Sequence, residues 1–286
     1  MSMLFAENGL HVSVYDISEK NIDNLRNILQ DGLAEDLHQR IAGFKDSDQF
    51  MESLGGKNAD KLLVFSIPHG SAADKVIAGI RKYLSRGDII LDGGNEWYEN
   101  AERRQHELAP DGIAYLSMGV SGGYQSARRG PSISPSGDKV ALDRVMPLLE
   151  KIAAKDPKTG QPCVTNLGPA GCGHYVKMVH NGIEQGILGI VNEAWELMYK
   201  CLHIDLDTIS QIFKEWEDEG ELVRPTAVSP TLNNDVHVPR NVISSWESVR
   251  TYASATKATD LGMSSTRYKT RLSKMQMTAK VGQNIA

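Results

Sequence analysis

The alternation of short apolar runs with amphipathic helical patterns over the first 168 residues constrains the fold of this chain more than any other feature. Each run reads as a buried strand that ends in polar residues or glycine, and a helical pattern usually separates it from the next. The predicted strands are 11–16, 61–67, 88–95, 113–123 and 163–168, and the predicted helices are 18–30, 71–84, 97–108 and 138–153. Such alternation predicts an α/β fold, a doubly wound parallel sheet with helices on its faces.

The start of the chain departs from the usual order of a dinucleotide-binding unit. In such a unit a first strand runs into a GxGxxG turn, a helix follows, and a second strand ends in an acidic residue. Here residues 1–10 already read as the helix, and 11–16 reads as the second strand with Asp16 at its tip. We therefore expect a sheet with a gap where the first strand is missing, and a nucleotide site without its glycine loop.

Asp16 has two interpretations. In the functional one its carboxylate accepts hydrogen bonds from the ribose hydroxyls of an adenosine, and in the other it only caps a turn, as Asp commonly does. The next residues, Ile17 and Ser18, supply no cation for a 2′-phosphate. Taken alone, this favours NAD over NADP.

The segment from 174 to about 202 keeps a helical period over an unusually long stretch, which indicates the start of a second, all-α domain. After about residue 222 the chain carries prolines without an apolar period, and its end is rich in Ser, Thr, Lys and Arg. We therefore predict a Rossmann-like domain at 1–170, a long helix opening a helical substrate domain at 171–222, and a poorly ordered tail at 223–286.

On the long helix a short polar patch lies beside an apolar stripe. At about 100° per residue the stripe, which must pack on something, contains Val176, Val179, Ile183, Ile187, Ile190 and Ala194. The patch contains Lys177, His180, Asn181 and Glu184, and the same face turns apolar further along. A mixed patch that stops abruptly indicates the floor of a pocket, and the alternative is a partly exposed polar stripe.

Lys177 and Glu184 lie about 10 Å apart along the helix axis, so a small sugar acid fits between them. A lysine desolvated in such a pocket can act as a base near neutral pH, and the glutamate can act as an acid.

Two glycine-rich turns follow predicted strands. DGGNEWY places Asn95 after one strand, and VSGG places Ser121, Gly122 and Gly123 after another. Ligands of open α/β sheets bind at the carboxyl ends of strands, and the serine turn offers a hydroxyl and backbone amides to an anion. Tight turns alone would also explain the glycines.

Composition narrows the partners. A formal net charge of -5 gives no basic field for nucleic acid, and no apolar run is long enough to span a membrane. The N-terminus does not read as a signal peptide, so a cytoplasmic location is expected. Three cysteines without a CxxC pair predict neither a disulfide framework nor a metal site.

The motifs HYVKMVHNGIE, LDGGNEWY, GVSGGYQSARRGPSISPSG and AGCGHYVK together resemble the decarboxylating 6-phosphogluconate dehydrogenases. The resemblance is collinear from about residue 2 to about 222. Relatives in the wider β-hydroxyacid dehydrogenase superfamily share the Ser-Gly-Gly turn and the Lys-x-x-x-Asn spacing but, as a rule, not the His and Glu of the helix.

The resemblance implies oxidative decarboxylation of 6-phosphogluconate to ribulose 5-phosphate and CO2 with reduction of a nicotinamide cofactor, a step of the pentose phosphate pathway. Lys177 would take the proton of the 3-hydroxyl as hydride leaves C3, and Glu184 would then protonate C1 of the enediol. The matching substrate-binding positions are Asn95, Ser121, Gly122, Gly123, His180 and Asn181. The matching cofactor-binding positions are Asp16, Ile17, Ser18, Ile67, Pro68, His69 and Asn95.

The resemblance further implies NADP as cofactor and a homodimer whose sites borrow residues from the partner subunit. NAD stays open, because NADP-preferring members carry an Asn-Arg-Thr run where this chain has Asp16, Ile17 and Ser18. The family's tyrosine, a contact of the substrate phosphate, is replaced by Gln185. We expect a family member shortened at both ends with an unrelated tail.

Two alternatives remain beside the enzyme. One is a catalytically silent remnant or a fragment that only joins full-length subunits. The other is an NAD-dependent 3-hydroxyacid dehydrogenase acting on an unphosphorylated acid, suggested by Asp16 and Gln185. We expect the isolated chain to have weak activity or none.

Overall fold

The computed structural model describes residues 1–30, 37, 39–57 and 60–218. The predicted tail at 223–286 lies outside the described residues. The chain divides into two compact units, the first running from Met1 to Ile183 and the second beginning at Glu184. The predicted boundary near residue 170 remains a prediction, although the first turns of the long helix belong to the first unit.

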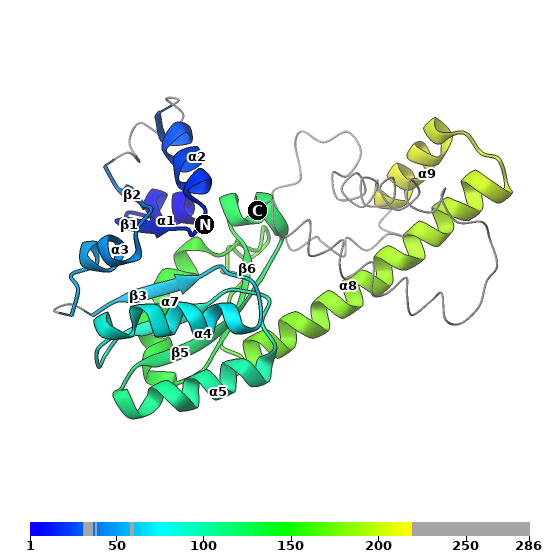
Figure 1. Cartoon of the computed structure of the whole chain (residues 1–286). Coiled ribbons are helices and arrows are strands. Elements are labelled where there is room, and N and C mark those ends of the chain that lie inside the picture. Colours follow the sequence, from blue (N-terminus) through cyan, green and yellow to red (C-terminus); the bar gives the residue numbers. More distant parts are fainter. Residues whose placement is uncertain (31–36, 38, 58–59, 219–286) are drawn as a thin grey trace. The chain divides into compact units, whose positions relative to one another are not determined.

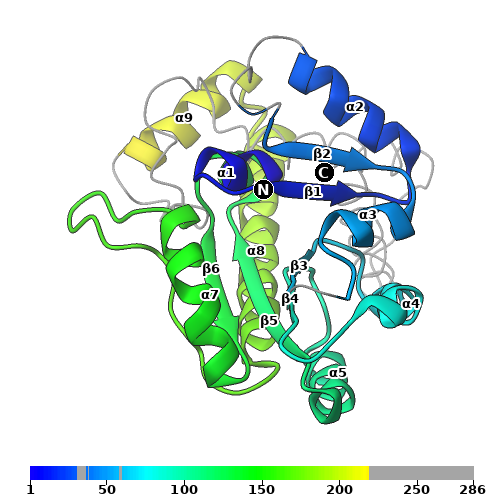
Figure 2. The same cartoon turned by 90° about the vertical axis from the view of Figure 1, so that its left-hand side faces the viewer.

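Strands of the first unit form two separate sheets. β1 (Val12–Tyr15) pairs in parallel with β2 (Ile41–Phe44), while β3 (Leu62–Phe65), β4 (Ile89–Asp92) and β5 (Ala114–Ser121) form a parallel set. β6 (Ser132–Ser136) completes the second sheet antiparallel to β5. The expected gap is thus present, because among the described strands none pairs with both β1 and β3. In Figure 2, β1 and β2 lie horizontally, whereas β5 runs steeply between the upper and lower parts of the view.

The helices of the first unit surround these sheets (Figure 1). Their bounds are α1 (Ser2–Glu7), α2 (Glu19–Gln30), α3 (Ser47–Ser53), α4 (Ser71–Ile80), α5 (Tyr98–Leu108), α6 (Gly123–Arg129) and α7 (Lys139–Ile152). Two 3-10 turns, Arg81–Tyr83 and Ala109–Asp111, follow α4 and α5. The predicted helix at 71–84 therefore ends in a tighter turn.

Strand alternation divides the core into two layers. Leu91, Leu116 and Met118 pack with α7 and with Leu4 and Phe5 of α1. Residues one position out of phase, Ile90 and Tyr115, pack with α4 and α5 on the other face. Figure 2 shows α7 on one side of the sheet and α4 and α5 on the other. Both faces are covered, as the near-continuous apolar strands require.

One predicted strand is wrong. Residues 163–168 form no strand, and only an isolated parallel bridge joins Val164 to Ile133. The segment instead supplies single contacts to β6, including a hydrogen bond from the Leu167 amide to the Pro135 carbonyl (2.9 Å). Polar and glycine residues around Val164 leave too few apolar side chains to extend the pairing.

The long helix predicted at 174–202 is α8 (Cys172–Glu196), which continues as a π-helical segment at Leu197–Cys201. In the second unit the end of α8 and α9 (Leu206–Asp218) enclose a small core of Met198, Ile209 and Phe213. Most of the apolar stripe predicted to be packed is exposed instead, with Val176, Val179, Ile183 and Ile190 at 43, 41, 60 and 69%, while Ile187 and Ala194 are half-buried.

Candidate active site

A close approach of two glycines seats the first turn of α8 on the second sheet. A Cβ on Gly173 would lie 2.9 Å from the Ser117 carbonyl oxygen and closer still to that of Ser134, and a Cβ on Gly119 would lie 2.9 Å from Lys177 Cβ. The Gly173 amide donates to Ser136 Oγ at 2.7 Å. Because neither glycine has a side chain, α8 can approach closely enough for Lys177 to lie against β5.

Seated in this way, α8 places its polar patch against both predicted strand-end turns. Lys177 Nζ donates to Ser121 Oγ at 3.1 Å. One turn further on, Asn181 Nδ2 donates to Asn95 Oδ1 at 3.3 Å, and His180 Nδ1 lies 3.2 Å from Asn181 Oδ1. The structure thus brings together Lys177, His180 and Asn181 with the turns after β4 and β5.

The Ser121 turn has the backbone that its sequence predicts. Gly122 and Gly123 have φ angles of 119° and 65°, which L side chains rarely adopt, and both residues are exposed. α6 begins directly at Gly123. The turn therefore presents open backbone beside the Ser121 hydroxyl.

Glu184 is half-buried on α8, seven residues beyond Lys177, and is the first residue of the second unit. Its role as the acid remains a prediction.

On the predicted cofactor side, Asp16 caps the turn that precedes α2. Its Oδ1 accepts from the Ser18 amide at 2.7 Å, and its Oδ2 accepts from Asn21 Nδ2 at 2.9 Å. The capping interpretation is therefore present in the structure, and binding of ribose remains a prediction. Ile17, next to it, is 88% exposed.

The loop after β3 carries the remaining predicted cofactor residues, Ile67, Pro68 and His69. Ile67 packs on the core, while Pro68 and His69 are exposed. A Cβ on Gly94 would lie 2.8 Å from the Ile67 carbonyl oxygen, so this loop touches the turn that carries Asn95. The carboxyl ends of β3, β4 and β5 lie at one sheet edge, as their parallel register requires.

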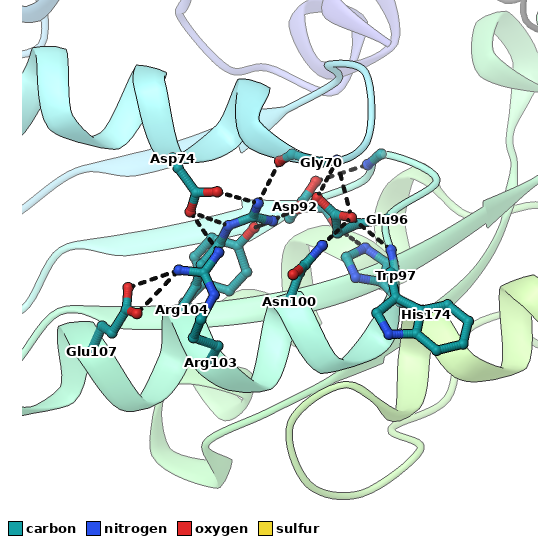
Figure 3. Close-up of polar contacts among 12 residues, drawn as sticks. Gly70, Asp74, Asp92, Glu96, Trp97, Asn100, Arg103, Arg104, Glu107 and His174 are labelled. Atoms are coloured by element: carbon teal, nitrogen blue, oxygen red, sulfur yellow. Dashed lines mark hydrogen bonds and ion pairs between the residues drawn. The ribbon is translucent and has the colours of Figure 1, made fainter.

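Beneath these two loops lies a buried polar network that the sequence analysis did not identify (Figure 3). Arg104 and Glu96, 1 and 6% exposed, form an ion pair at 2.7 Å. Asp92 receives a hydrogen bond from Tyr115 Oη at 2.5 Å and, through its carbonyl oxygen, one from His174 Nε2 at 3.0 Å. One sequence signal could have revealed this network: Arg104 falls on the same face of its helix as the apolar residues Ala101 and Leu108.

His174 links α8 to the end of β4. Burial lowers the pKa of its imidazole, against the opposing effect of Asp92, so the ring is held neutral. Its Nδ1 has no hydrogen-bond partner in the described part of the chain.

Acidification should weaken the contacts of Asp74 with Arg103 and Arg104, at the partly exposed side of this network. Hydrogen bonds from Arg104, and less strongly from Arg103, lower the pKa of Asp74 from 3.8 to about 2. A carboxyl with a depressed native pKa stabilises the fold above its unfolded pKa, and this contribution is lost as the pH falls toward 2. Melting temperatures measured from pH 5 to 2 should fall more steeply for the wild type than for Asp74→Asn. The difference should correspond to about 1 kcal/mol, because the side chain is partly solvated. Parallel curves would contradict this prediction.

Among the residues that the structure describes, no group of three or more His, Cys, Asp or Glu side chains is placed to hold a metal ion. Over the same residues, no helix has the length and apolar character to cross a membrane.

Residues 1–168 match the NAD binding domain of 6-phosphogluconate dehydrogenase, and residues 173–224 match the C-terminal domain of 6-phosphogluconate dehydrogenase. The first match, together with the strand-end loops, defines the class: a protein with an NAD-binding α/β domain joined to a helical segment. The chain belongs to the 6-phosphogluconate dehydrogenase family, an oxidoreductase family.

The relatives agree with this assignment. A decarboxylating 6-phosphogluconate dehydrogenase of Emericella nidulans is 50% identical over 222 residues, which are 78% of this chain and 44% of that protein. The enzyme of Escherichia coli is 38% identical over 75% of this chain and 43% of its own length. The chain therefore spans under half the length of the curated relatives that it matches.

Solved structures give the same fold. The 6-phosphogluconate dehydrogenase of Plasmodium falciparum, described in its apo form and with its cofactor NADP+ or its substrate 6-phosphogluconate, matches with a TM-score of 0.65 and 36% identity. The match covers 76% of this chain and 44% of that one. A 3-hydroxyisobutyrate dehydrogenase of Salmonella typhimurium, at 19% identity and a TM-score of 0.59, shares the fold alone.

Proposed function

We propose that this chain carries the nucleotide-binding domain and the catalytic helix of a decarboxylating 6-phosphogluconate dehydrogenase. The reaction is oxidation of 6-phosphogluconate and loss of CO2 to give ribulose 5-phosphate. The observation that carries the proposal is the seating of α8, in which Lys177 reaches Ser121 at 3.1 Å and Asn181 reaches Asn95 at 3.3 Å. A solvated polar stripe would not make hydrogen bonds to two strand-end turns at once.

Each residue has a role that its surroundings support. The Lys177 amine, beside the Ser121 hydroxyl, takes the proton of the substrate's 3-hydroxyl. Asn95, Ser121, the Gly122 and Gly123 backbone, His180 and Asn181 hold the sugar acid. Glu184 is proposed to deliver the proton to C1, on the strength of its match to the family's helix.

The residues present fit a nicotinamide nucleotide. Asp16 holds a carboxylate at the end of β1, and the loops after β3 and β4 meet at the carboxyl edge of the second sheet. When bound, the nucleotide would accept the hydride from C3. Its adenosine side would be lined by Asp16, Ile17, Ser18, Ile67, Pro68 and His69, and Asn95 would lie near the nicotinamide.

We propose NADP as the cofactor, with NAD as the alternative. The family expectation is NADP, and the Plasmodium relative has NADP+ as its cofactor. Against it, the Asp16 carboxylate would repel a 2′-phosphate. The Lys45 ammonium already pairs with two carboxylates, those of Glu19 and Asp23, at 3.2 and 2.9 Å, so its charge is partly neutralised. A homodimer and a cytoplasmic location likewise remain predictions.

The test follows reduced nicotinamide formed by the purified chain with 6-phosphogluconate, using NAD and NADP in parallel. We expect weak turnover that Lys177→Ala lowers by a further 10²- to 10⁴-fold, because the general base is lost. Lys75→Ala, on α4, is the matched control and should leave the rate unchanged. No turnover with either nucleotide would favour the silent fragment. Oxidation of an unphosphorylated 3-hydroxyacid in place of the sugar phosphate would favour the third interpretation.

A further inference from the structure

One carboxylate and one guanidinium link the two loops of the candidate nucleotide site. The Glu96 carboxylate accepts from the Gly70 amide at 2.9 Å and from the Trp97 amide at 2.7 Å. Arg104 Nη1 donates to Glu96 at 2.7 Å, and its Nη2 donates to the Gly70 carbonyl oxygen at 2.6 Å. Figure 3 shows these contacts converging between α4 and α5. We call Glu96 and Arg104 the clamp.

Gly70 is the point that the clamp holds most completely. Its amide is bound by Glu96 and its carbonyl by Arg104, so the clamp fixes both of its backbone hydrogen-bonding groups. The residue has φ 86° and ψ -137°, a conformation open essentially to glycine alone. It directly follows His69 and forms the N-cap of α4, so its conformation sets the direction of the loop after β3.

The clamp keeps its charges although it is buried. Burial opposes ionisation of Glu96, but hydrogen bonds from Asn100, Arg104 and two backbone amides outweigh it, and the carboxyl pKa is lowered. Burial likewise opposes the charged form of Arg104, but its bonds to Asp74 and Glu96 raise the guanidinium pKa. A buried ion pair is weak as a source of stability. The hydrogen bonds of this pair to the backbone of Gly70 and Trp97 instead fix the geometry of the two loops.

We propose that the clamp is a positioning pair for nucleotide binding, holding the 67–70 loop and the 93–97 turn in the relative placement that the bound nucleotide requires. The inference rests on the proposed function, because those segments carry Ile67, Pro68, His69 and Asn95. Loss of the clamp releases both segments together, since each reaches the other through Glu96.

The chain supplies a matched control beside the clamp. Arg103, also on α5, pairs with Asp74 at 2.8 Å and with Glu107 at 3.0 Å, and its described contacts do not include either loop. Arg104→Met and Arg103→Met therefore remove the same charge from neighbouring positions, and both remove a partner of Asp74. Only Arg104→Met breaks the bond to Gly70.

The experiment measures two quantities on the full chain. Hydrogen exchange of the Gly70 and Trp97 amides should accelerate at least roughly tenfold in Arg104→Met, whereas the Gly94 amide, bound to Asp92 at 2.9 Å, should change little. Affinity for reduced NAD and reduced NADP, measured by nucleotide fluorescence, should weaken roughly tenfold for the nucleotide that the wild type binds, about 1.4 kcal/mol. Arg103→Met should change neither quantity more than about twofold.

A second variant and a second readout separate positioning from folding. Glu96→Gln keeps one acceptor oxygen for the Trp97 and Gly70 amides, but its amide nitrogen cannot accept from Arg104 Nη1. Because Arg104 keeps its bond to the Gly70 carbonyl oxygen, this variant should produce smaller changes of the same kind. A merely structural role would lower the melting temperature yet leave its increase on adding nucleotide unchanged. A positioning role reduces that increase in Arg104→Met.

The outcomes are distinct. If the wild type binds a nucleotide and Arg104→Met binds it equally well, or if the two amides exchange at the wild-type rate, the clamp has no positioning role. If the wild type binds neither nucleotide, the proposed function fails, and this inference fails with it.

Discussion

Replacing Gly173 with alanine is expected to lower the free energy of unfolding by about 3 kcal/mol and to lift the start of α8 from the sheet. The added Cβ would meet the carbonyl oxygens of Ser117 and Ser134, which belong to paired strands and have no room to retreat. The change would also weaken the hydrogen bond from the Gly173 amide to Ser136 Oγ. Because Lys177 lies one turn further on, its contact with Ser121 should be lost as well.

Urea unfolding of Gly173→Ala and Gly182→Ala checks this prediction. A Cβ on Gly182, in the same helix, meets no described atom within 4 Å. Alanine is the better helix former, so Gly182→Ala should stabilise by about 0.5–1 kcal/mol. Two variants of equal stability would show that the close approach at Gly173 is not what seats the helix.

The second large effect is expected at the opposite end of the strands, where Asp88→Ala should cost about 3–5 kcal/mol. Lys61 Nζ and Asp88 Oδ2 lie 3.1 Å apart, and both side chains are fully buried. The carboxylate also accepts from the backbone amides of Lys61 (2.9 Å) and Ser85 (2.8 Å). Removing it leaves a buried ammonium without this carboxylate and two amides without their acceptor.

Denaturant titration should show almost no effect of the control Asp48→Ala, because Asp48 and Lys82 are more than half exposed and such pairs contribute about 0–1 kcal/mol. The double variant Lys61→Met with Asp88→Leu should recover much of the lost stability, since apolar groups can replace a buried pair. A loss from Asp88→Ala no larger than that from Asp48→Ala would contradict the prediction.

The sequence predicts those elements whose apolar period is unbroken. The runs at 61–67, 88–95 and 113–123 contain β3, β4 and β5, because every side chain of these strands is buried or half-buried. β2 and β6 escaped prediction, since IAGF has only four residues with a central glycine and SISPS combines serines with Pro135. Their pairing depends on neighbouring strands and not on their own pattern.

The candidate site divides in the same way. The helical period alone places Lys177 and Asn181 on one face, and parallel strand ends predict the turns at Asn95 and Ser121 that they contact. Arg104 shares a face of α5 with Ala101 and Leu108, but its burial was not predicted because charged residues on a helix usually face solvent. Its burial depends on Glu96, eight residues earlier, and on Gly70, in another loop, and no local pattern joins those positions.

Under the proposed function, the turn capped by Asp16 would tie nucleotide selectivity to the local structure before α2. One carboxylate caps that turn through the Ser18 amide and the Asn21 side chain, and the same carboxylate would set the charge that a bound ribose meets. Engineering at residue 16 toward a phosphorylated nucleotide therefore alters two properties at once. Asparagine, which keeps an acceptor oxygen while removing the charge, is the substitution that separates them.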